Sequence, residues 1–469
     1  MGESAVEAKG WGDLLAQGRA ARFVLIMLGV WLNAADALVT ATIMPSVGSE
    51  LGGYAYFSWA TAGFLVGAIL ASASSGRFSE AMGLRRATVL AGAITAAGCL
   101  ASAWASDIWV FLAGRLVQGL GSGWVSGLAM VAIARIFPER HLPRVFAAIT
   151  GVWGVATLVG PLLGGLFAQA HDWRGVFWLF AIQTAGFSLA AIWLLPAGGE
   201  RERGTGVPWP QLGVLGLGVA AIGAADVVRR ASLALGLVAA GCVIMGLVVR
   251  LDDHGRVRML PKRAHDLRTP VGAGYAAMFL MTAASMGFAI YAPPILQTLR
   301  GYSPLTAGYV VAMESLAWTV TALMVADASA WWDSFWVRIG SLLLLASVMV
   351  LGWALADQPL AAVLAGASLL GAAFGFSWSF MARRVMAALT DEDRAIGSSA
   401  IIAVRQAGAA AGAALAGAAA NLAGFSEGLT PAAARAASGW VFWSVIPLAL
   451  GGVWGAFRLT GRAAGETSP

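Results

Sequence analysis

The sequence predicts an all-α polytopic membrane protein with two six-helix bundles, an inserted two-helix hairpin and 14 transmembrane helices in total. Composition is the first reason. Of 469 residues, 59% are hydrophobic and only 12% are charged, whereas a soluble domain carries about 25% charged residues. The second reason is a set of 14 apolar runs, most of them close to the ~20 residues that a membrane-crossing helix needs. A large soluble core is therefore excluded.

The apolar runs distribute the expected helices along the whole chain. The first six cover residues 23–45, 56–75, 87–105, 108–134, 145–168 and 176–195. Two more, 212–228 and 231–249, lie between the longest polar breaks. The last six cover 271–296, 306–326, 339–355, 360–381, 396–423 and 440–457. An even number of crossings leaves both ends of the chain on the same side of the membrane.

The positive charges agree with this topology. With the N-terminus inside, 23 of the 30 Lys and Arg residues fall in inside segments, five fall outside and two lie within spans. Cytoplasmic loops carry such an excess, so we expect both termini in the cytoplasm and the protein in the inner (plasma) membrane. The expected tails are residues 1–22 and 459–469, and the first lacks the apolar core and cleavage site of a signal peptide.

The two longest polar breaks predict the domain boundaries. They cover residues 197–210 and 251–270, which we expect to be a cytoplasmic linker and a cytoplasmic loop on either side of a transmembrane hairpin at 211–250. The flanking bundles are expected at 23–196 and 271–458. Two six-helix halves around a pseudo-two-fold axis are the plan of many secondary transporters.

Four ionisable side chains fall well inside the expected spans, where a charge costs at least ~2.5–3.5 kcal/mol at the bilayer centre. They are Asp36, Arg115, Glu314 and Arg405. Asp36 and Glu314 are candidates for binding and releasing protons, and Arg115 is the natural counter-charge for Asp36 if the first and fourth helices touch. The alternative is a static pair that fixes helix register. For Arg405, a structural or lipid-facing role competes with a role in a cavity.

Other residue types exclude several classes of function. All four histidines lie outside the expected spans, which argues against a metal site or a histidine proton relay in the membrane. No nucleotide-binding motif of the form GxxxxGK[ST] is present. We therefore expect no cofactor and no enzymatic activity, and pumping has to draw on an ion gradient. The net charge of +6 reflects loop placement, so no nucleic-acid partner is expected.

Many of the 20 tryptophans lie near expected span ends, as interfacial belt residues do. Others lie deeper and are candidates for lining a substrate cavity suited to a greasy or cationic ligand. For any single one, packing against lipid or a neighbouring helix is the alternative. The full set of candidate cavity residues, including polar ones, is Trp31, Trp124, Trp153, Trp318, Tyr291, Gln118 and Arg405.

The fifth expected helix has an unusual run of small residues. Without their side chains, another helix can approach closely. Pro161 removes a backbone donor and is expected to kink the helix, which neighbouring helices tolerate in a membrane. Taken alone, the run fits ordinary small-residue packing as well as a flexible gate helix. Its glycines are Gly151, Gly154, Gly160, Gly164 and Gly165.

The motifs together resemble those of the major facilitator superfamily, most closely its fourteen-span drug:proton antiporter branch. The run from Asp36 to Pro45 matches the family's Asp…Pro motif, and Arg115-Leu-Val-Gln118-Gly119 matches its arginine motif. The run Gly76-Arg-Phe-Ser-Glu80-Ala-Met-Gly83-Leu-Arg85-Arg86 is similar to its cytoplasmic gating motif, with Glu80 in place of the usual aspartate. Gly151 to Gly165 matches the antiporter motif, and Arg405-Gln406 is also similar to this branch.

The resemblance implies a proton-coupled secondary transporter that exports hydrophobic or amphipathic compounds by alternating access, acting as a monomer. It links Arg115 with proton coupling and the segment around Glu80 with a cytoplasmic gate. Export of a lipid or cell-envelope precursor is the alternative on the same scaffold. Uptake of sugars or organic acids is a weaker one, because the Gly160-Pro161 motif and the few amides in the spans disfavour it.

Overall fold

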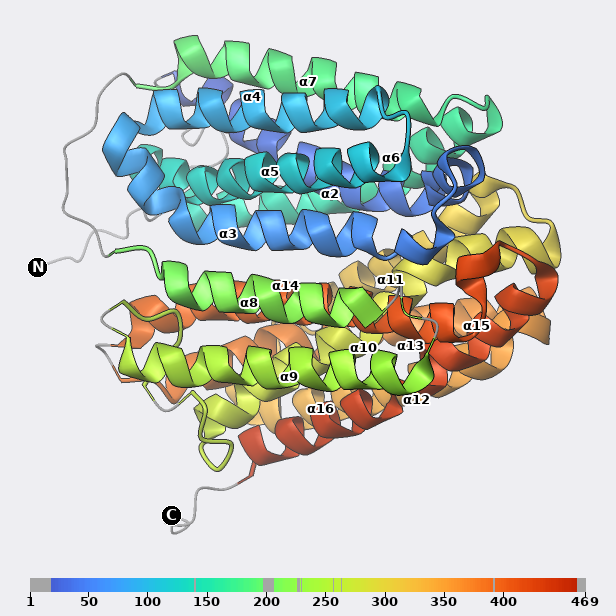
Figure 1. Cartoon of the computed structure of the whole chain (residues 1–469). Coiled ribbons are helices and arrows are strands. Elements are labelled where there is room, and N and C mark those ends of the chain that lie inside the picture. Colours follow the sequence, from blue (N-terminus) through green and yellow to red (C-terminus); the bar gives the residue numbers. More distant parts are fainter. Residues whose placement is uncertain are drawn as a thin grey trace, which may run out of the picture.

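The computed structural model describes residues 18–138, 141–196, 206–225, 228, 230–255, 257–262, 264–390 and 393–461. Within these residues the regular elements are all helical, and most of the helices run side by side along one direction (Figure 1). This arrangement confirms the all-α fold class that the composition predicted. Residues 1–17, 197–205 and 462–469, which include most of both expected tails and most of the 197–210 linker, lie outside the described residues.

The helices follow the order of the apolar runs. The first group consists of α2 (Arg19–Leu51), α3 (Trp59–Met82), α4 (Leu84–Ala103), α5 (Ile108–Ile136), α6 (Leu142–Gln169) and α7 (Trp173–Leu194). Two helices follow, α8 (Trp209–Ala224) and α9 (Ala231–His254). The last group consists of α10 (Pro270–Arg300), α11 (Pro304–Met324), α12 (Asp333–Asp357), α13 (Leu360–Ala387), α14 (Arg394–Leu422), α15 (Pro431–Trp443) and α16 (Ile446–Leu459).

Two prolines have opposite effects on the helices that contain them or begin beside them. The first span was expected to stop at Pro45, but α2 continues through it to Leu51, as membrane helices can when neighbouring groups satisfy the freed backbone. The last expected span is instead broken into α15 and α16. Pro447 has no N–H to donate to the carbonyl of Trp443, one turn earlier, and α15 ends at that residue.

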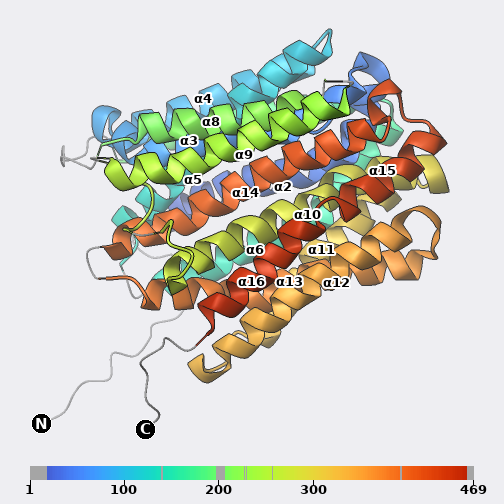
Figure 2. The same ribbon diagram turned by 60° about the horizontal axis from the view of Figure 1, so that its bottom comes forward.

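Thirteen stretches of the described chain are long and apolar enough to cross a membrane, with α15 and α16 counted as one. Helix α8 has only 16 residues and is a shorter apolar helix. It nevertheless packs against α9 along the bundle, in the position expected for a fourteenth crossing (Figure 2). The chain is therefore a multi-pass membrane protein.

The helices of each group pack mainly on one another. Helices α2 to α7 share most of their contacts, as do α10 to α16, and the two groups meet along α6 with α11 and α3 with α14. Helices α8 and α9 pack beside α14, with α8 also against α3. This packing agrees with two bundles and a hairpin, while the bounds 23–196, 211–250 and 271–458 remain predictions.

Helices α3 and α5 touch backbone to backbone. A Cβ atom on Gly119 would lie 2.1 Å from the Phe64 carbonyl oxygen, and one on Gly123 would lie 2.3 Å from the Ala68 carbonyl oxygen. Conversely, a Cβ on Gly67 would lie 2.5 Å from the Leu116 carbonyl oxygen. Small residues permit this approach between membrane helices, and it fixes how α5 presents its polar side chains to α2.

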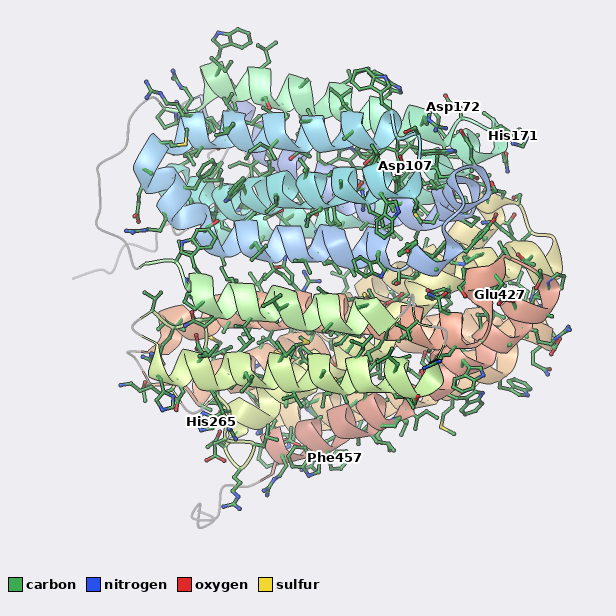
Figure 3. The ribbon with its side chains drawn as sticks, in the orientation of Figure 1. Asp107, His171, Asp172, His265, Glu427 and Phe457 are labelled. Carbon is green, nitrogen blue, oxygen red and sulfur yellow. The ribbon has the colours of Figure 1, made fainter. Side chains whose placement is uncertain are left out.

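The two groups of helices meet through aromatic rings at one end of the bundle. Helix α2 begins and α16 ends at the other end, on the left of Figure 1, which we call the termini end. The end with the aromatic rings, where Figure 3 labels Asp107, His171, Asp172 and Glu427, we call the far end. Aromatic rings from both groups pack together at the far end, and we call this cluster the far-end latch. It consists of Tyr54, Phe57, Tyr291 and Phe425.

The far-end latch closes the bundle at that end. Phe57, between α2 and α3, lies 5.9 Å from Tyr291 of α10 and 5.5 Å from Phe425 of the short helix η6 (Phe425–Glu427), measured between ring centroids. The Asn421 side-chain amide donates to the Ala55 carbonyl oxygen at 2.6 Å across the same seam. Phe57 and Tyr291 are fully buried.

The α3–α5 contact gives a first testable prediction. Gly123→Val adds a side chain where a Cβ alone would already lie 2.3 Å from a carbonyl oxygen, so the helices have to separate, at a cost of at least about 1–3 kcal/mol. We expect a lower thermal unfolding midpoint and a smaller monodisperse fraction in detergent. Gly63→Val on α3, where nothing lies within 4 Å, is the matched control. Equal unfolding midpoints for the two variants would contradict the close contact.

Candidate functional site

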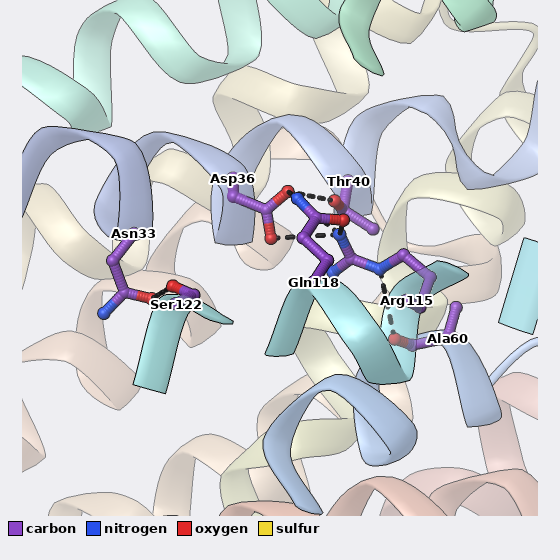
Figure 4. Close-up of polar contacts among 7 residues, drawn as sticks. All are labelled: Asn33, Asp36, Thr40, Ala60, Arg115, Gln118 and Ser122. Carbon is purple, nitrogen blue, oxygen red and sulfur yellow. Dashed lines mark hydrogen bonds and ion pairs between the residues drawn. The ribbon is translucent and has the colours of Figure 1, made fainter. Parts of the chain in front are cut away.

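Asp36 of α2 is buried in a network of polar side chains from α5 (Figure 4). The Arg115 guanidinium donates from one nitrogen to both carboxylate oxygens, at 2.9 and 3.0 Å. Gln118 donates to the carboxylate at 2.8 Å and accepts from Arg115 at 2.8 Å. Asp36, Arg115 and Gln118 are 3%, 2% and 2% exposed. The two helices therefore touch as the sequence analysis required for this ion pair.

The surroundings of Arg115 hold its guanidinium in place. Its Nε donates to the Ala60 carbonyl oxygen of α3 at 3.3 Å, and its guanidinium carbon lies 4.6 Å from the centre of the Phe64 ring. Arg115 lies one turn before Gly119, where α3 and α5 touch. The close approach of these helices thus brings a backbone acceptor and an aromatic face to a buried cation.

This arrangement suits the ionised form of Asp36. A carboxylate that accepts from Arg115 and Gln118 has its charge matched by a cation and a polar donor. A proton on Asp36 would remove the negative charge and leave Arg115 without its counter-ion. The site is therefore a buried ion pair between α2 and α5. Asn33 and Ser122 extend the polar line between the same two helices, with Oγ of Ser122 donating at 3.3 Å.

The glycine stretch of α6 lies between α2 and α11. A Cβ on Gly160 would lie 2.7 Å from the Leu38 Cβ, and one on Gly164 would lie 2.9 Å from the Thr42 Cβ, both on α2. On the other side, a Cβ on Gly165 would lie 2.6 Å from the Leu305 Cα of α11. Helix α6 continues through Pro161 without a break.

The glycines nearer the termini end are different. Gly151 and Gly154 face nothing within 4 Å, and Trp153 between them is 38% exposed. The stretch therefore combines tight packing towards the far end with an uncovered half towards the termini end. Trp153 remains a candidate cavity residue only as a proposal, because exposure in a membrane protein also fits contact with lipid.

The other two charged residues inside the spans lie near the middle of α11 and α14. Glu314 and Arg405 are both partly exposed, and neither makes a hydrogen bond or ion pair to another described residue in this conformation. Next to Arg405, Gln406 accepts from Ser72 of α3 at 3.4 Å. An unpaired acid and an unpaired base at this depth are costly, which favours a functional role over a structural one.

Aromatic rings next to Glu314 form a cluster that the sequence analysis identified only in part. Trp318, one turn after Glu314, stacks on Phe374 of α13 at 5.0 Å. Trp378, one turn after Phe374, lies 6.4 Å from Trp318 and 6.3 Å from Phe374. Trp318 and Trp378 remain partly exposed. Phe374 was not among the candidates, and its spacing from Trp378 puts both rings on one face of a helix.

The remaining candidate cavity residues have structural partners. Trp31 donates to Gln183 of α7 at 3.1 Å, and Trp124 donates to Ser74 of α3 at 2.9 Å while stacking on Phe78. Tyr291 belongs to the far-end latch and is fully buried. In this conformation Trp31 and Trp124 hold neighbouring helices together, and Tyr291 lines no open surface.

The residues of the gating motif cluster at the termini end. Gly83 joins α3 to α4 with φ of +79°, a backbone conformation that favours glycine. Arg85 donates from Nε to the Leu195 carbonyl oxygen at 2.7 Å, at the end of α7. Arg86 is exposed, and Gly76 faces nothing within 4 Å. Within the described residues, the structure contains no group of three or more metal-ligating side chains.

The matching region of the second half has its own ion pair and arginine hydrogen bonds. Asp333, at the start of α12, is buried and pairs with Arg383 of α13. Arg338 donates to both the side chain and the carbonyl oxygen of Thr460, at 2.8 and 3.1 Å.

Comparison with known proteins places these features in a family. A probable multidrug-efflux transporter of Mycobacterium tuberculosis is 29% identical over 475 residues, covering 98% of this chain and 99% of that protein. Among solved structures, a D-xylose–proton symporter superposes with a TM-score of 0.64 at 18% identity, over 94% of this chain and 97% of the other. A POT family transporter in complex with 5-aminolevulinic acid gives 0.65 at 13% identity, over 92% and 95%.

The family model of the Major Facilitator Superfamily matches residues 26–413. The match covers α2 to α13 and most of α14, and so includes the Asp36–Arg115 pair and the glycine stretch of α6. The chain is therefore a transporter that belongs to the Major Facilitator Superfamily.

Proposed function

We propose that this transporter exports hydrophobic or amphipathic compounds in exchange for protons, by alternating access. The observation that carries the proposal is the buried pair of Asp36 with Arg115, completed by Gln118. A single proton would neutralise this buried carboxylate and separate it from its counter-ion. Because protonation changes which contacts are favourable, it can couple proton binding to a change of conformation. The likeness to a probable multidrug-efflux transporter supports the direction.

The conformation suits one step of such a cycle. The far-end latch is closed, and Asp36 is in its ion-paired form. With the termini in the cytoplasm, as the distribution of Lys and Arg favours, we assign this conformation to the part of the cycle in which the outer side is shut and Asp36 has released its proton. A substrate then binds from the cytoplasmic side. A proton arriving at Asp36 from outside would favour the outward release of the substrate.

Glu314 and the aromatic cluster of Trp318, Phe374 and Trp378 are our proposed substrate-contacting region. An acid without a partner beside partly exposed indole rings suits a greasy or cationic compound. Glu314 also remains our second candidate for carrying a proton. Arg405, on α14, supplies a positive charge at similar depth in the membrane.

The proposed gate lies at the termini end, at Glu80, Gly83, Arg85 and Arg86. In the present state Arg85 is bonded within its own group of helices, to the end of α7. In the outward-facing state we expect Arg85 and Arg86 to help hold the cytoplasmic ends of the helices together. We propose that the protein works as a monomer in the plasma membrane, since the Asp36 network and the aromatic cluster are formed within one chain.

The coupling role of Asp36 predicts the outcome of a conservative substitution. Asp36→Asn keeps the size of the side chain but can neither carry the charge nor release a proton. In proteoliposomes with a trapped pH indicator, substrate-driven proton movement should fall to background while downhill substrate movement persists. Asp107→Asn, at the exposed start of α5, should couple like the wild type. Normal coupling in Asp36→Asn would remove this residue from the mechanism.

The gate predicts a conformational bias. In Arg85→Glu/Arg86→Glu, the two cations that hold the outward-facing state become anions, so the protein should stay closed at the far end and lose efflux. A reporter cysteine at Ala307, fully buried at the far end of α11, should react more slowly with an impermeant maleimide, in a Cys242→Ser background. Unchanged efflux and unchanged labelling together would refute the gate. Arg250→Glu, an exposed arginine at the termini end of α9, is the control.

The aromatic cluster predicts an effect on binding. Trp318→Ala removes the ring that stacks on Phe374, and such a pair is worth about 0.5–1.5 kcal/mol beyond its buried area. Binding of an amphipathic fluorescent dye such as ethidium, measured by polarisation on purified protein, should weaken by at least about threefold. Trp353→Ala on α12, 56% exposed, should bind normally. If both variants bind the dye equally well, the substrate does not contact this cluster.

A further inference from the structure

The outer face of α4 and α7 carries a long apolar groove. Two hollows of about 410 and 420 Å³ lie along it, and both are bordered by Ala93 of α4 and Ile192 of α7. Because they share these residues, the hollows form one continuous depression. The two helices lie side by side at the top of Figure 1, on the side of the first group of helices opposite α10 to α16.

Small side chains form the floor of the groove and larger ones its walls. The hollow nearer the far end is lined by Ala93, Ala96, Ala97, Leu100, Ala185, Ser188, Leu189 and Ile192. From Leu100 to Arg85 the groove follows α4 over 15 residues, or about 22 Å at the rise of an α-helix. That is more than half of the ~30 Å hydrocarbon core, so the groove is long enough to hold an extended acyl chain.

The end of the groove at the termini end is positively charged. The second hollow is lined by Arg85 and Arg86 together with Met82, Val89, Leu90, Ala93 and Ile192, and none of the residues described at its border is acidic. Arg86 is exposed and makes no hydrogen bond or ion pair to a described residue. Both arginines lie in the first turn of α4, where the free backbone N–H groups of a helix also favour an anion.

We propose that this groove is a binding site for one phospholipid with an anionic headgroup. One acyl chain lies along the alanine floor between α4 and α7, and the phosphate contacts Arg86 and the start of α4. Charge complementarity selects the headgroup, because among the described residues the ionisable side chains that border the groove are the two arginines. The proposal does not depend on the transported substrate, since none of its contacts involves Asp36, Glu314 or α11.

Lipid binding can be measured directly. Purified, delipidated wild-type protein is titrated with palmitoyl-oleoyl-phosphatidylglycerol or the matching phosphatidylcholine, and bound lipids are counted by native mass spectrometry. We expect one phosphatidylglycerol to bind at least about tenfold more tightly than phosphatidylcholine. Arg86→Gln should weaken phosphatidylglycerol binding about fivefold, the effect of one basic residue at a membrane surface, and leave phosphatidylcholine unchanged. Ala93→Leu/Ala97→Leu should fill the floor and weaken both lipids.

The controls separate a lipid site from a simple anion site. Arg250→Gln and Ala240→Leu, both on the exposed face of α9, should bind both lipids like the wild type. Millimolar glycerol 3-phosphate should not displace the bound phosphatidylglycerol. Equal affinity for the two lipids in the wild type, wild-type binding in both groove variants, or displacement by glycerol 3-phosphate would each overturn the proposal. Monodisperse elution and an unchanged unfolding midpoint establish that the variants are folded.

Discussion

The ion pair between Asp36 and Arg115 is the interaction on which the rest of the first group of helices depends. Taking two charges out of water costs several kcal/mol per ion, and only good geometry and extra hydrogen bonds offset that cost. Gln118 and the Ala60 carbonyl oxygen supply those bonds here. The Ala60 oxygen of α3 lies within reach of Arg115 because α3 and α5 touch at Gly119 and Gly123. Helix packing and electrostatics are thus two parts of one constraint.

The same constraint is why we propose that the pair responds to protons. Removing one partner from a buried ion pair leaves an uncompensated charge, at a cost of about 3–5 kcal/mol. A proton on Asp36 has a comparable effect on Arg115. The protein can relieve that cost by changing the packing of α2, α3 and α5 or by admitting water. A shift of a few kcal/mol is enough to reverse which of two conformations is populated.

Helix α6 is the element through which such a change would reach the second group of helices. Its Gly164 packs on Thr42, less than two turns after Asp36 on α2. Gly308 of α11 approaches both Thr42 and Pro161, with a Cβ there lying 2.8 Å from the Thr42 hydroxyl oxygen. Any movement of α2 at this level therefore meets α6 and α11 at once. Since α11 also carries Glu314, we infer that the two acids are mechanically linked.

Much of this could be predicted from the sequence, because membrane spans and charges inside them are strong local signals. The pairing of Asp36 with Arg115 followed from charge and from the resemblance. The partners of Trp31 and Trp124, the position of Tyr291 in the far-end latch and the break between α15 and α16 did not. The side-chain partners depend on which residue of a distant helix lies opposite, and apolar helices give little periodic signal to orient their faces. The groove on α4 and α7 was hidden for the same reason. The break at Pro447, in contrast, is a local effect of proline that the expected span 440–457 overlooked.

The arginines at the termini end show how each group of helices is held together. In the first group, Arg85 near the start of α4 donates to the Leu195 carbonyl oxygen at the end of α7. In the second, Arg338 near the start of α12 donates to the Thr460 carbonyl oxygen at the end of α16. Cations at the last carbonyls of a helix are favourable, and both bonds join the third helix of a group to its last.

These bonds also indicate which parts can move. Both connect helices within one group, whereas the far-end latch and the contacts of α6 with α11 connect the two groups. The bonds within each group can persist while the contacts between the two groups break. Each group can therefore move as a nearly rigid body about a seam that is closed at the far end in this conformation. In the first group, the Arg85 bond ties α4 to α7, which lie side by side on the outer face of that group, so this pair of helices can move together with the helices that form the Asp36 network.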